Sequence, residues 1–303
     1  MCTKPWSAPA RRAMPVIGAG YNPRLVPYSD PSRMPPVRFQ LPLCLSLVVL
    51  LAGCAAAPPP VADSPAAHDA HAHDRHRLWR LVSTRCLPQA RLGADPAPCS
   101  DVHPGPGERY ALMKDLRGDY QYLLIPTVPV SGIEDPRARG AGVPNWLGLA
   151  WQARTRVEQL LQRPLPRELT SLTINPPSAR SQDQLHIHID CLAPQVRDQL
   201  QAMQAAIGPT WAPLPQPLHG HVYRAMRLEG EALDANPLTL LARALPPHQH
   251  MAHQTLAVVG AAFDGRPGFV LLAATALPGD GVGAEELQDH DCTGVVPAAA
   301  ARG

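Results

Sequence analysis

The sequence predicts an α+β fold in which helices pack against an antiparallel sheet. Two pairs of apolar runs, each joined across a glycine-containing turn, predict β-hairpins at residues 110–127 and 255–274. Helical spacing of apolar residues predicts helices at 146–162 and 194–207. Because 45% of the 303 residues are hydrophobic, the chain has enough apolar side chains to bury a substantial core.

The first part of the chain has the pattern of an exported, lipid-anchored protein. Residues 1–33 lack periodicity, and we expect them to be disordered or to precede a true start at Met34. Residues 34–53 have the charge and apolar pattern of a signal peptide. The tetrapeptide at 51–54 resembles a bacterial lipobox, which implies cleavage before Cys54 and acylation of it; an uncleaved signal anchor is the alternative. Both the lipid anchor and the signal anchor predict a periplasm-facing protein at the inner membrane. Sorting to the outer membrane is the alternative location.

Composition divides the rest of the chain into a tether, a folded domain and a tail. Residues 54–76 are rich in Ala, Pro and His, and we interpret them as a solvated tether that binds zinc weakly at most. The folded domain is expected over 77–293 and opens with a short amphipathic helix at 78–82. Residues 294–303 are expected to be a disordered tail.

Four cysteines belong to the predicted folded domain: Cys86, Cys99, Cys191 and Cys292. An even number of cysteines in an exported domain indicates disulfides, and three pairings are possible. A local Cys86–Cys99 bridge would close a proline-rich loop and leave Cys191 to pair with Cys292 near the C-terminus. Buried free thiols are the alternative.

The stretch 181–191 carries the most specific chemical pattern. A strand at 171–175 and a proline-containing loop lead into it. Polar and apolar residues alternate along the stretch, so a strand would set Gln184, His186, His188 and Asp190 on one face. Two imidazoles on one strand face are typical of a nucleophile with an assisting acid or base, or of a metal site. An exposed polar strand edge is the third interpretation.

The same stretch resembles the histidine-triad (HIT) superfamily. In that superfamily a strand reads His-x-His-x-His, and its middle His attacks the α-phosphate of a nucleotide. The resemblance makes His186 the nucleophile and His188 the last His, with Gln184 in the place of the first. A register that starts at His186 would instead make His188 the nucleophile.

The resemblance extends over about residues 78–292. It includes the segments 122–127, 144–146, 149–154, 182–191, 220–221 and 286–292 together with Asn175. This pattern resembles the bacterial CDP-diacylglycerol pyrophosphatase family, a membrane-associated part of the HIT-like superfamily. The resemblance implies a HIT-like sheet and hydrolysis of CDP-diacylglycerol to CMP and phosphatidate through a cytidylyl-histidine. We expect no cofactor and no bound metal.

The candidate substrate-binding residues surround the histidines in the sequence. They are Asn175, Arg180, Ser181, Gln182, Gln184 and Lys114. Their donors would hold phosphate oxygens, and Asn175 matches an asparagine that HIT proteins place before the middle His. The alternatives are ordinary turn residues at 175–182 and a solvated charge at Lys114, which we prefer for that lysine.

The net charge and the export signal indicate which partner and which other functions are compatible with the sequence. A net charge of +2 without a dense basic run argues against a nucleic-acid partner, and no protein partner is indicated, so the expected partner is CDP-diacylglycerol in the bilayer. Two alternatives are a HIT-type hydrolase of a soluble nucleotide and a non-enzymatic, metal-binding lipoprotein. The second hairpin echoes the first, which would fit a weak internal duplication.

Overall fold

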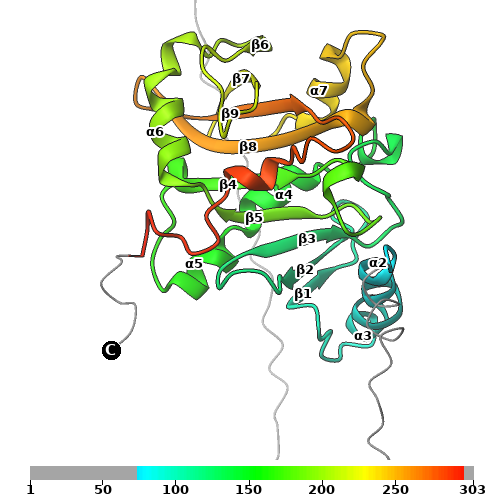
Figure 1. Ribbon diagram of the computed structural model, residues 1–303. Helices are drawn as coiled ribbons and strands as arrows, with labels where there is room; N and C mark the ends of the chain where they lie inside the picture. Colours follow the sequence, from blue (N-terminus) through cyan, green and yellow to red (C-terminus); the bar gives the residue numbers. More distant parts are fainter. Residues whose placement is uncertain (1–73, 297–303) are drawn as a thin grey trace, which may run out of the picture. The chain divides into compact units, whose positions relative to one another are not determined.

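A nine-stranded antiparallel sheet forms the centre of the computed structural model, which describes residues 74–296 (Figure 1). The strand order is β1-β2-β3-β5-β4-β8-β9-β7-β6. The strands are β1 (Asp101–His103), β2 (Tyr110–Lys114), β3 (Tyr122–Pro126), β4 (Thr170–Ile174), β5 (Ile187–Cys191), β6 (Ala212–Pro213), β7 (Arg224–Glu229), β8 (Gln254–Phe263) and β9 (Arg266–Thr275). The signal peptide, Cys54 and nearly all of the tether lie outside the described residues, as does most of the tail.

The α+β prediction and both hairpins are confirmed. Strands β2 and β3 pair from Tyr110 opposite Pro126 to Lys114 opposite Tyr122. Strands β8 and β9 pair along their whole length and turn through Asp264 and Gly265, whose φ angles are +50° and +74°. Two positive φ angles favour an Asp-Gly pair, because glycine and aspartate adopt this backbone more readily than most residues.

The helices pack on both faces of the sheet, and two of them differ from the predicted lengths. The helices are α2 (Arg77–Leu81), α3 (Leu87–Arg91), α4 (Trp146–Ala153), α5 (Thr155–Leu161), α6 (Pro194–Ala202) and α7 (Pro237–Ala244). A π-helical turn, Val82–Cys86, joins α2 to α3. The helix predicted at 146–162 is divided at Arg154 into α4 and α5, and the one predicted at 194–207 ends at Ala202 before a separate 3-10 turn.

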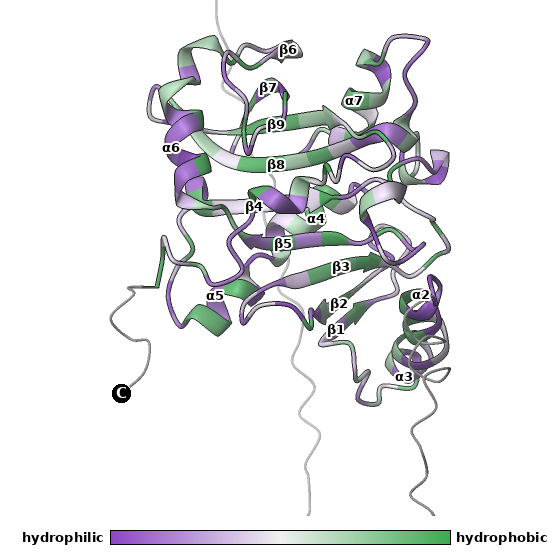
Figure 2. Ribbon diagram, viewed as in Figure 1, coloured by the Kyte–Doolittle hydropathy of each residue, from purple (hydrophilic) through white to green (hydrophobic). Residues whose placement is uncertain are grey.

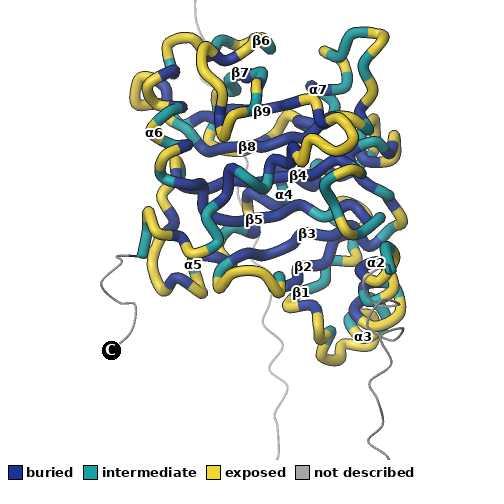
Figure 3. Tube along the Cα trace, in the orientation of Figure 1, coloured by how far each residue is buried: buried dark blue, intermediate teal, exposed yellow. Residues whose placement is uncertain are grey.

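Alternation along the strands gives the two sheet faces different partners. One face packs against α4, α5 and α7 in a single large apolar core that includes Ile187 and Ile189 of β5. The other face has two separate apolar clusters: β8 and β9 with α6, and β2 and β3 with α2. Strands β3, β4 and β5 are buried along their whole length, whereas α6 carries hydrophilic residues on its outer side (Figures 2 and 3).

A polar strip lies between those two apolar clusters, on β4 and β5. Its buried members include Ser171, Thr173, His188 and Asp190. Gln288, from the C-terminal segment, covers the strip and satisfies two of these groups: its Nε2 donates to Ser171 Oγ at 3.0 Å, and its Oε1 accepts from Thr173 Oγ1 at 3.1 Å. The sheet thus presents histidine and carboxylate groups where neither apolar cluster covers them.

The strand predicted over 181–191 is wrong in its first half, since β5 begins only at Ile187. The alternation before it reflects contacts outside the sheet ladder. The Leu185 amide donates to the Val130 carbonyl, and the Asp183 amide donates to the Arg75 carbonyl, each at 2.6 Å. His186 therefore occupies the last position before the strand rather than its middle.

Both cysteine pairs are bridged. Cys86 bonds to Cys99 and Cys191 bonds to Cys292, with S–S distances of 2.05 and 1.99 Å. The second bridge fastens the end of β5 to the C-terminal segment. Within residues 74–296 no helix combines the length and the apolar character that crossing a membrane requires.

Candidate active site

A cavity of about 570 Å³ lies where α2, the β2–β3 turn, the loop after β4 and the start of β5 meet. Its polar wall brings together seven side chains: Lys114, Asp115, Asn175, Ser181, His186, His188 and Glu285. The rest of its lining is largely apolar, with Leu78, Leu81, Pro98, Met113, Leu116 and Leu123. A cleft that joins an apolar wall to a few convergent polar groups is the usual form of a small-molecule site.

His186 is held in one orientation by the main chain. Its Nδ1 lies 2.6 Å from the carbonyl oxygen of Gln184. Because a carbonyl only accepts, Nδ1 carries the proton and Nε2 keeps its lone pair. Burial lowers the pKa of His186 below the ordinary histidine value. The ring is therefore neutral near pH 7, which is the form that acts as a nucleophile.

His188 lies beside His186, with ring centroids 5.0 Å apart. It is only 5% exposed, and neither ring nitrogen has a hydrogen-bond partner among the described residues. Its Nδ1 is 3.5 Å from Glu285 Oε1 and 3.9 Å from Asp115 Oδ2. Burial, followed by repulsion from His186 and His290, lowers the pKa of His188 well below its ordinary value. A buried, unpartnered imidazole is costly, so this one has unused capacity to bind a ligand.

Glu285 and His290 complete the polar wall from the C-terminal segment, and the sequence analysis did not single them out. Asn175 Nδ2 donates to Glu285 Oε2 at 2.9 Å, and the Glu285 amide donates back to Asn175 Oδ1 at 3.3 Å. His290 Nδ1 lies 2.6 Å from Asp190 Oδ2, and its Nε2 lies 3.8 Å from Glu285 Oε1. The hydrogen bond to Asp190 raises the pKa of His290.

The positions of the cysteines could have indicated the contact between Asp190 and His290. Asp190 immediately precedes Cys191, and His290 lies two positions before Cys292. Once the two cysteines are paired, the segments that carry the acid and the imidazole are brought together. Gly118 strengthens this arrangement from the β2–β3 turn: its φ is +60°, and an added Cβ would lie 2.6 Å from His290 Cβ. The turn that carries Asp115 and Arg117 is thereby packed on the C-terminal segment.

Gln184 does not face the cavity, which is a correction to its expected place beside the histidines. It is 1% exposed and is absent from the cavity lining. Its Nε2 donates to the carbonyls of Pro126 and Val128, each at 2.9 Å, and its Oε1 accepts from the Val130 amide at 3.3 Å. The side chain thus holds the loop after β3, because that loop leaves the sheet with unpaired main-chain groups.

Arg180 and Gln182 line the cavity but are engaged within the protein. Arg180 is 4% exposed in its side chain and donates to both oxygens of Glu134, at 2.7 and 2.8 Å, and to Asp183 Oδ1 at 3.0 Å. Gln182 Oε1 accepts from the Leu78 amide at 2.7 Å and so caps the first turn of α2. These contacts fix the walls of the cavity.

Ser181 and Lys114 both place polar groups on the cavity wall. Ser181 is exposed and lines the cavity. Lys114 also lines it, and its Nζ donates to the carbonyls of Asp115 and Gly118 at 2.7 and 2.9 Å. An ammonium group has three donors, so one remains for a phosphate oxygen or for water.

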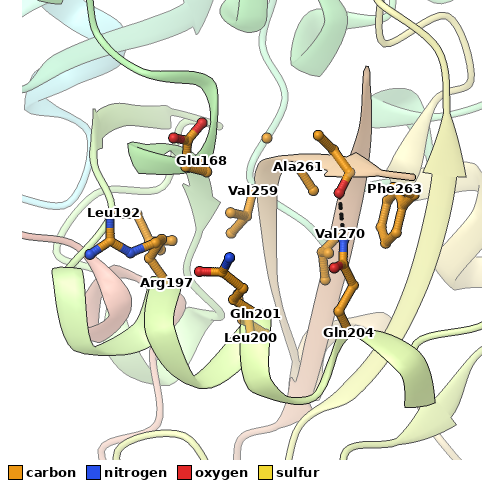
Figure 4. A pocket seen from close by; sticks show the side chains of 12 residues that line it. Glu168, Leu192, Arg197, Leu200, Gln201, Gln204, Val259, Ala261, Phe263 and Val270 are labelled. Atoms are coloured by element: carbon orange, nitrogen blue, oxygen red, sulfur yellow. Dashed lines mark hydrogen bonds between the residues drawn. The ribbon is translucent and has the colours of Figure 1, made fainter. Parts of the chain in front are cut away.

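Two other features of the described residues do not resemble a catalytic site. A cavity of about 310 Å³ between α6 and β8 is lined by Leu200, Val259, Phe263 and Val270, with Glu168 and Arg197 at its edge (Figure 4). It contains no histidine. Asp190, Cys191 and Cys292 are close enough together to suggest a metal site. Both sulfurs are in a disulfide, however, so neither is a thiolate ligand.

Comparison with known families identifies the chain. The family model described as CDP-diacylglycerol pyrophosphatase matches residues 73–295. That range includes both cavity histidines, both disulfides and the C-terminal residues Glu285 and His290. The family consists of hydrolases that cleave the pyrophosphate bond of CDP-diacylglycerol. The chain therefore belongs to the CDP-diacylglycerol pyrophosphatase family.

Proposed function

We propose that this enzyme hydrolyses CDP-diacylglycerol to CMP and phosphatidate through a covalent intermediate on His186. The observation that carries the proposal is the 2.6 Å contact between His186 Nδ1 and the Gln184 carbonyl. It fixes the tautomer and directs a neutral Nε2 away from its own main chain, in a residue that lines the cavity. His188 has no such contact, which favours His186 over the other register.

The reaction proceeds in two displacements at the cytidylyl phosphorus. First, Nε2 of His186 forms a bond to phosphorus while the bridging P–O bond breaks, and phosphatidate leaves with the electron pair. Second, water attacks the same phosphorus, the P–N bond breaks, and CMP leaves with the oxygen of water. The proton lost by that water passes to a carboxylate in the cavity, where Asp115 and Glu285 are available.

His188 reduces the electrostatic repulsion between the carboxylates of the site and the diphosphate of the substrate. Asp115 and Glu285 would repel the diphosphate of the substrate, and the cavity holds a neutral His188 between them. An incoming anion favours the charged form of a nearby imidazole, so substrate binding raises the pKa of His188 and brings a proton with it. The protonated ring then donates to a phosphate oxygen as charge shifts in the transition state.

The remaining donors hold the phosphates from the sides. Lys114 and Ser181 lie on the cavity wall with donors to spare, and Arg117 lies at its edge, 3.7 Å from Glu285. Asn175 positions Glu285 through two hydrogen bonds. The contributions of Arg180, Gln182 and Gln184 are indirect, because their side chains hold the loops that form the cavity.

The protein faces the periplasm from a membrane, held by lipid on Cys54. The lipobox-like segment 51–54 supports this part of the proposal, and the lipid substrate is consistent with it. A covalent lipid anchor contributes about 0.8 kcal/mol for each methylene that it buries, so more than one acyl chain would hold the protein firmly. Metabolic labelling with a radioactive fatty acid tests the anchor, since label should be lost in Cys54→Ser.

Turnover of three variants tests the nucleophile. His186→Asn should lose activity by roughly 10³-fold or more, because no other group replaces Nε2. His188→Asn should retain the covalent step in part. His248→Asn is the matched control, since His248 is exposed in a loop outside the cavity. Full turnover by His186→Asn would remove that residue from the proposed role.

A further inference from the structure

Part of the cavity lining is apolar and has no role in the proposed reaction at the diphosphate. Leu78 and Leu81 reach it from α2, and Met113 and Leu123 reach it from β2 and β3. At about 570 Å³ the cavity is within the range of roughly 300–1,000 Å³ that accommodates a single drug-sized ligand. A cytidine diphosphate group is a ligand of that size. Two long acyl chains have no room beside it.

Leu116 lies at the mouth of this cavity. It lines the cavity and is nevertheless 94% exposed. It occupies the β2–β3 turn, whose place is fixed by the close approach of Gly118 to His290. A single exposed leucine is common on protein surfaces. Its position beside the opening and its charged neighbours distinguish this one.

Three exposed arginines surround the same opening: Arg77, Arg85 and Arg117. Arg77 and Arg85 form no ion pair with another residue of the described domain, whereas the Arg117 guanidinium lies 3.7 Å from Glu285 and its amide donates to Asp115 Oδ1 at 3.2 Å. An exposed apolar side chain among exposed cations, two of which have no ion-pair partner here, is the pattern that binds an anionic lipid surface. We call Leu116, Arg77, Arg85 and Arg117 the rim.

We propose that the rim docks on the bilayer that holds the substrate, with Leu116 inserted among the acyl chains and the arginines on lipid phosphates. The inference rests on the proposed function and adds where the lipid half of the substrate stays. The head group enters the cavity toward His186, the glycerol lies along Leu78 and Leu81, and the acyl chains remain in the membrane.

The start of the described chain supports this orientation. Arg75 binds Asp183 through two hydrogen bonds of 2.7 and 2.8 Å, which lowers the pKa of Asp183 to about 2. This pair fastens the first described residues to the loop that forms one cavity wall. The described chain therefore begins beside the rim, because Arg75 lies two residues before Arg77.

The test compares two forms of the substrate with one pair of leucine variants of the full chain. Long-chain CDP-diacylglycerol is presented in vesicles that contain phosphatidylglycerol, and a dibutyryl analogue is presented as a dissolved monomer. Leu116→Asp is compared with Leu92→Asp. Leu92 is 79% exposed at the end of α3 and does not line the cavity, so it is a matched control.

The measured quantity is kcat/KM on vesicles divided by kcat/KM on the soluble analogue. Leu116→Asp should lower this ratio about tenfold or more, because a carboxylate replaces the inserted side chain. Leu92→Asp should leave the ratio unchanged. A double variant, Arg77→Ser with Arg85→Ser, should weaken the salt dependence of the vesicle reaction.

The outcomes separate the two proposals. An unchanged ratio in Leu116→Asp, or an equal loss on both substrates, overturns the docking inference. An equal fall of the ratio in Leu92→Asp also overturns it, because the effect would not belong to the rim. If the unaltered protein cleaves neither substrate, the proposed function fails instead.

Discussion

Replacing Gln184 tests whether this residue supports the cavity or binds the substrate. In the structure its side chain forms three hydrogen bonds to the main chain, at Pro126, Val128 and Val130. The site is 1% exposed, so water does not reach the groups that a truncation leaves behind. At about 0.5–1.5 kcal/mol for each bond, Gln184→Ala should lower the free energy of unfolding by about 2–4 kcal/mol.

The assay is thermal and urea unfolding of the full chain with its disulfides intact. For a domain of this size, the loss corresponds to a fall in Tm of roughly 4–16 °C. Gln152→Ala is the control, since Gln152 is exposed on α4 and should cost nothing measurable. The His186 orientation depends on the main-chain carbonyl at residue 184, which the substitution retains. A Tm equal to that of the unaltered protein, together with loss of activity, would refute this reasoning.

Three further predictions concern the site and its bridges. Because burial lowers the pKa of His186 and the neutral ring is the nucleophile, kcat/KM should stay level as pH falls to 6.5 and decline only below it; a half-loss above pH 6.5 would contradict this. Binding of CDP should be accompanied by proton uptake, measured by calorimetry in buffers of different ionisation enthalpy, and His188→Asn should abolish the uptake. Removing the Cys191–Cys292 bridge by double alanine substitution should lower the free energy of unfolding by about 4.7 kcal/mol, and removing Cys86–Cys99 by about 3 kcal/mol, because the cysteines are 101 and 13 positions apart; the reverse order in urea unfolding would contradict the loop-entropy reasoning.

Local patterns were sufficient for much of the fold. The hairpins β2–β3 and β8–β9 were predictable because each consists of two apolar runs joined by turn residues that stand between them in the sequence. The helix predicted at 146–162 was found with a break at Arg154, which the apolar spacing did not reveal. Cysteine number and export indicated bridges, and the structure selected one pairing of three.

The candidate site was predictable only where it lay on one segment. His186 and His188 are two residues apart, so their proximity was evident from the sequence. Glu285 comes to His188 from almost a hundred residues away, and only the Cys191–Cys292 bridge hinted at that contact. Gln184 shared the alternation of the histidines, yet its segment is not in the ladder, because the loop after β3 takes its hydrogen bonds. A pattern along the chain does not show which main-chain groups elsewhere need a partner.

The most direct test of the central claim is to trap the protein during turnover. CDP-diacylglycerol carrying a radioactive cytidylyl phosphorus is mixed with the enzyme, the reaction is stopped in alkali, and the labelled peptide is sequenced. The account predicts a cytidylyl group on His186 that is stable in base, is lost in acid and is absent from His186→Asn. Turnover without any such adduct, or an adduct on His188, would contradict it.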